Sequence, residues 1–171
     1  MPAKKIPKKT QSVVIVIICI IPVLIAMFFL MRQDALPPPA GYGETKHKLT
    51  IINNHGATTT RTIDVLVAET PAQRARGLSG MLSLPRDEGM LFLFDQSDKF
   101  TFWMPDMHFA IDMVWISEDW RVVDVTHHAT PESYPKTIFS PRIPARYVLE
   151  INDNMANAWG IASGTVMELD K

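Results

Sequence analysis

Residues 111–126 read IDMVWISEDWRVVDVT, and this stretch decides the expected fold. Two apolar runs, at residues 111–117 and 121–126, are joined by the polar turn Glu118-Asp119-Trp120. Short runs rich in valine, isoleucine and tryptophan are typical of β-strands connected by a turn. Short apolar runs and turn residues continue to alternate on both sides, which favours an all-β sandwich or barrel.

Further strands are predicted on either side of this stretch. The first two, at residues 49–52 and 63–67, flank the turn Asn53-Asn54-His55-Gly56 and should form a hairpin. The remaining strands are expected at residues 90–94, 100–104, 146–151 and 165–169. The domain is therefore expected to be mainly β, with one or two short helices.

Capping residues mark the two helices. The sequence TPAQ at residues 70–73 matches a capping box: the threonine is the N-cap, the proline takes the first helical position and the glutamine reaches back. Gly77 should end this helix. Asn152 can cap a second helix that runs to Trp159 and closes at Gly160 in the left-handed conformation.

The N-terminal part carries an expected membrane anchor. Residues 13–31 contain no charge, hydroxyl or amide, and as a helix they would span roughly 28 Å, close to the thickness of the hydrocarbon core. A cleaved signal peptide is the alternative, but its apolar region is shorter and small residues follow it. Four lysines precede the run and Arg32 follows it, so the positive-inside rule keeps the N-terminus cytoplasmic.

These features divide the chain into four segments. Residues 1–11 form a cytoplasmic basic segment, residues 12–32 a transmembrane signal anchor and residues 33–45 a proline-rich linker. Residues 46–171 form a β-rich domain outside the cytoplasm. The expected location is the cell membrane, which the chain crosses once.

The charge balance argues against nucleic acid as a partner. The chain has 17 basic and 18 acidic residues, and four of the basic ones precede the anchor, which leaves 13 against 18 beyond it. An acidic domain of this kind does not attract a polyanion. Cys19 is the single cysteine, so the domain cannot contain an intramolecular disulfide.

Several short motifs occur in a characteristic order. They are RGL at 76–78, GMLF at 89–92, FWM at 102–104, ID at 111–112, YVLE at 147–150 and GI at 160–161 with Gly164. Through these motifs the chain resembles the domain of unknown function 192 family over about residues 49–169. The resemblance implies a compact β-sandwich of jelly-roll character, in proteins that are often secreted or membrane-anchored. It implies no established activity.

The stretch FWMPDMHFAID at residues 102–112 is the most distinctive part of the domain. Strand alternation would turn Trp103 away from the core, where an exposed indole beside Asp106 and Asp112 could stack on a sugar ring or flat ligand. His108 lies in the same stretch. The alternative is that this stretch only packs and turns.

The sequence also offers two hypothetical metal sites. Met104, Met107 and His108 carry soft ligands that suit Cu(I) outside the cytoplasm. His127 and His128 could contribute to a zinc site with neighbouring carboxylates. Adjacent strand residues point to opposite faces, however, which favours solvent-exposed histidines. The sequence leaves metal and cofactor unassigned.

Arg76 and Glu150 complete the candidate residues. Arg76 begins a loop at residues 77–89 with glycines at both ends, and a guanidinium there could receive an anionic ligand, or could simply be solvated. Glu150 lies in a predicted strand. It could bind a ligand, or pair with Arg146 or Arg76 as a surface charge.

The leading hypothesis is a non-catalytic accessory module that binds a small ligand, a glycan or an envelope partner. The outer domain has no cysteine and no G-x-S-x-G elbow, so nucleophilic catalysis finds no support. The alternatives are an envelope hydrolase that uses Asp112 and Glu150, and a structural subunit of a membrane complex. The expected ligand-binding residues are Arg76, Trp103, Asp106, His108, Asp112 and Glu150.

Overall fold

The computed structural model describes residues 46–54, 56 and 58–170. The expected cytoplasmic segment, anchor and linker, at residues 1–45, lie outside these residues. Across the described ranges, no helix is long and apolar enough to cross a membrane.

The described residues are mainly β, with two short α-helices, as the sequence predicts. In chain order the elements are β1 (His47–Asn53), β2 (Thr59–Ala68), α2 (Pro71–Arg76), β3 (Glu88–Asp98), β4 (Ile111–Ile116), β5 (Val122–Ala129), the 3-10 turn η1 (Pro131–Ser133), β6 (Ala145–Asn152), α3 (Met155–Ala158) and β7 (Val166–Leu169). The hairpin of β1 and β2 is confirmed, since the two strands pair antiparallel from His47 opposite Val65 to Asn53 opposite Thr59.

All seven strands belong to one sheet, in the order β5-β4-β6-β3-β2-β1-β7. This corrects the expected sandwich, in which two separate sheets would face each other. The reason is the connection through α2, which brings β3 back beside β2 in a parallel pair. Because β3 also pairs with β6, it joins what would otherwise be two sheets into one.

The sheet curls until its two ends meet at one corner. Arg121, just before β5, forms a bridge with Val166 of β7. The amide of Val122 donates to the carbonyl of Thr165 at 2.9 Å, and the amide of Met167 donates to the carbonyl of Trp120 at 2.9 Å. The result is a half-barrel that is closed at this corner.

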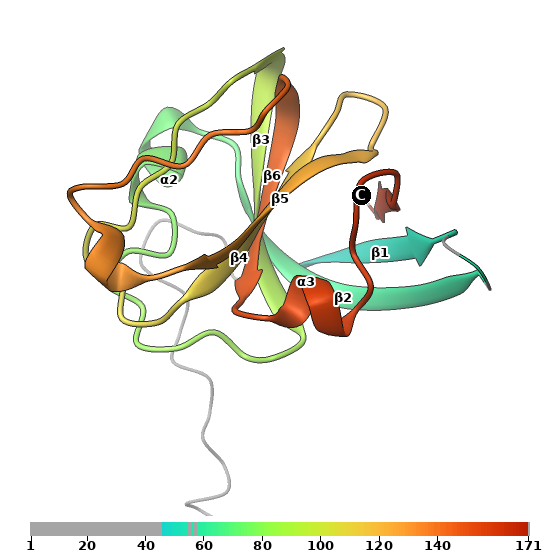
Figure 1. Ribbon diagram of the computed structural model, residues 1–171, viewed down its shortest axis with the longest axis horizontal. Coiled ribbons are helices and arrows are strands. Elements are labelled where there is room, and N and C mark those ends of the chain that lie inside the picture. The colour runs from blue at the N-terminus through green and yellow to red at the C-terminus, as the bar shows by residue number, and fades with distance from the viewer. Residues whose placement is uncertain (1–45, 55, 57, 171) are drawn as a thin grey trace, which may run out of the picture. The chain divides into compact units, whose positions relative to one another are not determined.

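Two apolar clusters lie on the two faces of the central strands. Because side chains alternate along a strand, Leu91 and Leu149 lie on one face. They belong to the cluster that also contains Ala156 and Trp159 of the α3 region. The same alternation sends Phe92 and Val148 to the other face. Figure 1 shows α2 and α3 on opposite sides of these strands. The central strands are buried on both faces, and every residue of β4 is buried.

Helix α2 begins as its sequence predicts. The hydroxyl of Thr70 accepts from the amide of Gln73, and the side chain of Gln73 accepts from the amide of Thr70, which completes the capping box. Gly77 ends the helix with a φ of 53° and a ψ of −139°, a conformation that favours glycine.

Two local predictions were wrong. Residues 100–104 do not form a strand; they make a single bridge, from Phe102 to Phe139. Asn152 does not cap α3, because its side chain donates instead to the carbonyls of Leu84 and Pro85. The N-cap of α3 is Asn154, whose φ is 62° and whose side chain makes no capping hydrogen bond.

Candidate functional site

A cavity of about 340 Å³ lies on the face of the sheet that α2 covers. Most of its walls come from three separate parts of the chain. They are residues 74–79 of α2 and the following turn, Phe92 and Phe94 of β3, and residues 100–105 with Met107. Glu150 of β6 contributes the sole acidic side chain among these lining residues.

Glu150 is buried beneath this cavity. On β6 it lies between Met90 of β3 and Met113 of β4, and its exposed fraction is 5%. No hydrogen bond or ion pair from the described residues reaches its carboxyl, and burial alone raises the pKa of Glu150 to about 8. The carboxyl is therefore mostly neutral at pH 7. The predicted pairing with Arg146 does not form, because Arg146 pairs with Glu118.

Arg74 places a fixed positive charge in the cavity wall. Its guanidinium donates to the carbonyl of Glu69 and, at 2.8 Å, to the carbonyl of Leu93. It also lies over the ring of Phe94, 5.1 Å from the centroid. Arg76, one of the predicted residues, contributes to the same lining.

Trp103 lies at the edge of the cavity and is 54% exposed. The bridge between Phe102 and Phe139 explains its orientation. Phe102 points inward, where it makes an edge-to-face contact with Trp115 at 5.4 Å, so the next residue turns outward. Ile138, directly before Phe139, is also exposed, at 61%. The predicted outward indole is confirmed, although a single bridge and not a strand produces it.

The turn after Trp103 holds one wall of the cavity. The hydroxyl of Ser79 donates to the carbonyl of Pro105 at 2.8 Å, and the amide of Gly80 donates to the carbonyl of Asp106 at 2.8 Å. Asp106 is exposed and has a φ of 54°. His108 is exposed as well. Neither side chain lines the cavity, so the structure does not bring these two predicted residues to the others.

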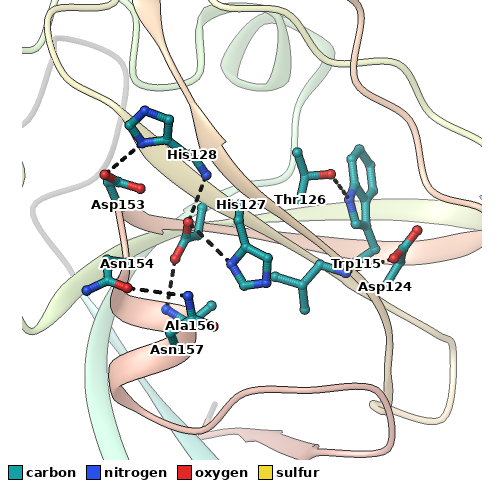
Figure 2. Close-up of polar contacts among 11 residues, drawn as sticks. Trp115, Asp124, Thr126, His127, His128, Asp153, Asn154, Ala156 and Asn157 are labelled. Carbon is teal, nitrogen blue, oxygen red and sulfur yellow. Dashed lines mark hydrogen bonds and ion pairs between the residues drawn. The ribbon is translucent and has the colours of Figure 1, made fainter.

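Asp112 is fully buried on the opposite face of the sheet from Glu150. It lies opposite Ile151 on β6, whereas Glu150 lies opposite Met113, so strand alternation separates the two carboxyl groups. One oxygen of Asp112 accepts from the amide of His128 at 3.1 Å and the other from the amide of Ala156 at 2.9 Å. Figure 2 labels His128 and Ala156, the residues whose amides donate to this carboxylate. The paired carboxylates of the hydrolase alternative are thus not brought together.

The contacts of Asp112 give it a structural task. Ala156 is the second residue of α3, whose N-cap side chain makes no capping bond, so a carboxylate from β4 satisfies a helix amide that would otherwise lack a partner. A β-bulge places both His127 and His128 opposite Asp112 on β5. The carboxylate therefore fastens this bulge to α3.

The predicted metal ligands do not converge. Met104 and Met107 are buried in the apolar cluster, whereas His108 is exposed. The ring of His128 contacts Asp153 at 2.9 Å, and that of His127 lies 3.7 Å from Asp112 (Figure 2). In the part of the chain that the structure describes, no three His, Cys, Asp or Glu side chains form a group that could hold a metal ion.

The comparisons with known proteins agree with this architecture. The model of the DUF192 family, described as an uncharacterized ACR, matches residues 51–169. The chain belongs to the DUF192 family. No curated protein matches the chain.

Two solved structures are similar to this DUF192 chain. A proposed transcription regulator from Sinorhizobium meliloti 1021 is 28% identical, with a TM-score of 0.68, over 75% of this chain and 95% of the other. A protein of unknown function from Novosphingobium aromaticivorans DSM 12444 is 30% identical, with a TM-score of 0.68, over 77% of this chain and 89% of the other.

Sequence reasoning missed most of the cavity wall. Three predicted residues, Arg76, Trp103 and Glu150, line the cavity, but its apolar walls were not predicted. The signal was present in four phenylalanines at alternating positions, 92 and 94, then 100 and 102, on either side of a polar turn. Such spacing puts four rings on one face, yet it is equally compatible with ordinary core packing.

Proposed function

We propose that this protein is a membrane-anchored, extracytoplasmic module that binds a small ligand in the cavity beneath α2. The observation that carries the proposal is Glu150, whose side chain is 5% exposed, receives no hydrogen bond from the described residues and lines an otherwise largely apolar cavity. Small-molecule sites are typically apolar pockets in which a few polar groups orient the ligand, and Glu150 is such a group. The cavity volume falls at the lower end of the range of small-molecule sites.

The surroundings of the cavity support binding more than catalysis. Glu150 has no second carboxyl or histidine beside it in the lining, so no acid–base pair is available there. Trp103 offers an exposed ring at the edge, suited to stacking on a flat ligand or a sugar. We do not extend the regulator role proposed for the Sinorhizobium meliloti protein to this chain, because its acidic outer part does not suit DNA.

Blocking the cavity should abolish ligand binding. Ala75 is exposed on α2 and lines the cavity, so Ala75→Trp would place an indole across it. The measurement is a thermal-shift screen of the full chain in detergent against organic acids, amides, amines and sugars, in which a ligand raises the unfolding temperature by mass action. We expect a saturable shift with at least one compound, and its loss in Ala75→Trp.

Ala72→Trp is the matched control for this screen. Ala72 is also exposed on α2 but does not line the cavity, so its replacement adds the same side chain without blocking the site. The proposal would be wrong if no compound shifted the wild-type protein, or if the two tryptophan variants bound the compound equally well.

The anchor requires a separate test. The full chain should remain in the membrane after an alkaline wash, and protease that has access to the outer face of this membrane should digest the domain. Ile20→Lys with Leu24→Lys should release the protein, because each lysine near the centre of a membrane helix costs about 3 kcal/mol. Gln33→Lys with Ala35→Lys adds the same charge beyond the apolar run and should leave the protein in the membrane. Retention of both variants would contradict the anchor.

A further inference from the structure

The charges of the cavity lining give the chemical class of the ligand. The charged residues among the lining are Arg74, Arg76 and Glu150. Burial holds the carboxyl of Glu150 mostly neutral at pH 7, whereas a guanidinium such as that of Arg74 is charged at this pH. Arg74 therefore gives the lining a positive charge, which favours an anionic ligand over a cationic one.

The positive charge of Arg74 is held in position. The guanidinium is fixed by the carbonyls of Glu69 and Leu93 and by the ring of Phe94. An ammonium ligand would enter beside this fixed charge and would require Glu150 to lose its proton in an apolar site. Both requirements oppose its binding.

A neutral carboxyl carries one O–H donor, and the donor of Glu150 has no acceptor among the described residues. A ligand that accepts a hydrogen bond would satisfy it. A ligand carboxylate does so best, because hydrogen bonds to a charged acceptor are stronger than bonds between neutral groups. The rest of the wall is largely apolar, with Phe92, Phe94 and Phe102 among its residues, and suits a ring or short hydrocarbon body.

We propose that the cavity binds a small organic acid whose carboxylate accepts a hydrogen bond from the Glu150 carboxyl and whose apolar body packs among the phenylalanines. This inference rests on the proposed function, since it names the ligand class of the same cavity. In the complex, the guanidinium of Arg74 offsets the ligand's negative charge.

Binding should then depend on the proton of Glu150. The groups packed against Glu150 from β3 and β4 are Met90 and Met113, which do not titrate. From α2 the charged groups in the lining are Arg74 and Arg76, and residues 100–107 contribute no charged side chain to it. Glu150 is therefore the titrating group that should set the pH dependence of binding.

Three probes with one ring and different polar groups test the inference: benzoate, benzamide and benzylamine. Their binding to the full chain in detergent is measured by ligand-observed NMR from about pH 6 to about pH 9. We expect benzoate to bind tightest and benzylamine weakest. The benzoate affinity should fall about tenfold over this range, in step with the fraction of protonated Glu150.

Two variants separate the hydrogen bond from general packing. Glu150→Gln keeps an N–H donor at every pH, so benzoate should still bind but without the pH dependence. Glu150→Leu removes the donor, and benzoate should then bind at least about tenfold more weakly. The thermal unfolding of each variant is measured alongside, so that loss of the fold is not taken for loss of binding.

The outcomes that overturn this inference differ from those that overturn the proposed function. The proposed organic acid would be wrong if benzylamine bound tightest, or if the affinity of the wild-type protein for benzoate rose or stayed constant with pH. Either result would still allow another ligand in the cavity. A screening ligand that is lost in Ala75→Trp while none of the three probes binds would lead to the same conclusion. If Ala75→Trp changes no binding at all, both proposals fall.

Discussion

Replacing Glu150 with glutamine should make the protein markedly more stable above pH 8 and should change its stability little below pH 4.5. The carboxyl has a pKa of about 8 in the folded protein, because burial disfavours its charged form, against 4.5 for a free glutamate. Glutamine has nearly the same shape and never ionises. The variant therefore removes the cost of a buried charge without opening a cavity.

The direction in which the stability changes with pH follows from proton linkage. Between these two pH values the unfolded chain releases the Glu150 proton while the folded protein retains it, so the stability of the wild-type protein falls as the pH rises. Below pH 4.5 both states are protonated and the cost disappears. Above pH 8 the cost is complete, and the difference of pKa corresponds to about 5 kcal/mol of unfolding free energy.

Urea unfolding at several pH values measures this effect. Glu168→Gln on β7 is the matched control, because Glu168 is exposed and the substitution makes the same chemical change outside the core. The gap between Glu150→Gln and the wild-type protein should widen with pH, whereas the control should show no comparable trend. A gap that does not vary with pH would mean that Glu150 is ionised in the folded protein.

Asp112→Ala should lower the unfolding free energy by about 3 kcal/mol, the second large effect, since it leaves one buried and one partly buried amide without an acceptor. These are the amides of His128 at the bulge and Ala156 in α3. Asp112→Asn should recover only part of the loss, because its amide nitrogen would face one of the two donors. The measurement is urea unfolding, combined with hydrogen exchange at both amides, which should become faster.

Asp153→Ala is the control for this prediction. Asp153 contacts the ring of His128 at 2.9 Å, but the two side chains are substantially exposed, and such surface pairs contribute less than about 1 kcal/mol. Equal losses for the two aspartate variants would show that Asp112 does not fasten α3 to the bulge.

These two carboxyl groups show how far the sequence could predict the site. Asp112 and Glu150 occupy comparable apolar strands, and the sequence presents both as candidate ligand-binding residues. Their surroundings differ because β4 and β6 pair in a register that puts the two carboxyl groups on opposite faces of the sheet. Register depends on the partner strand, which local sequence does not specify, so the cavity carboxyl and the structural carboxyl could not be told apart.

The fold was predictable where the signal is local. The capping box at Thr70 and the strand at residues 146–151 were identified because their signals lie within a few residues. The parallel pairing of β2 with β3 was not predicted, since it depends on how a distant segment returns to the sheet. The capping of α3 was assigned to the wrong residue because its acceptor, Asp112, lies more than forty residues earlier.

The pairing of β1 with β7 brings the first and last strands of the described domain side by side. The amide of Asp170 donates to the carbonyl of Lys48 at 2.9 Å, so the chain enters and leaves the sheet at neighbouring points. A short peptide could join these points without disturbing a strand, and new ends could be opened at the exposed turn around Asp119. Such a circularly permuted chain would begin and end between β4 and β5 and would keep the same strand order in space. The cavity, which is formed by parts of residues 74–107 and by Glu150, would be unchanged.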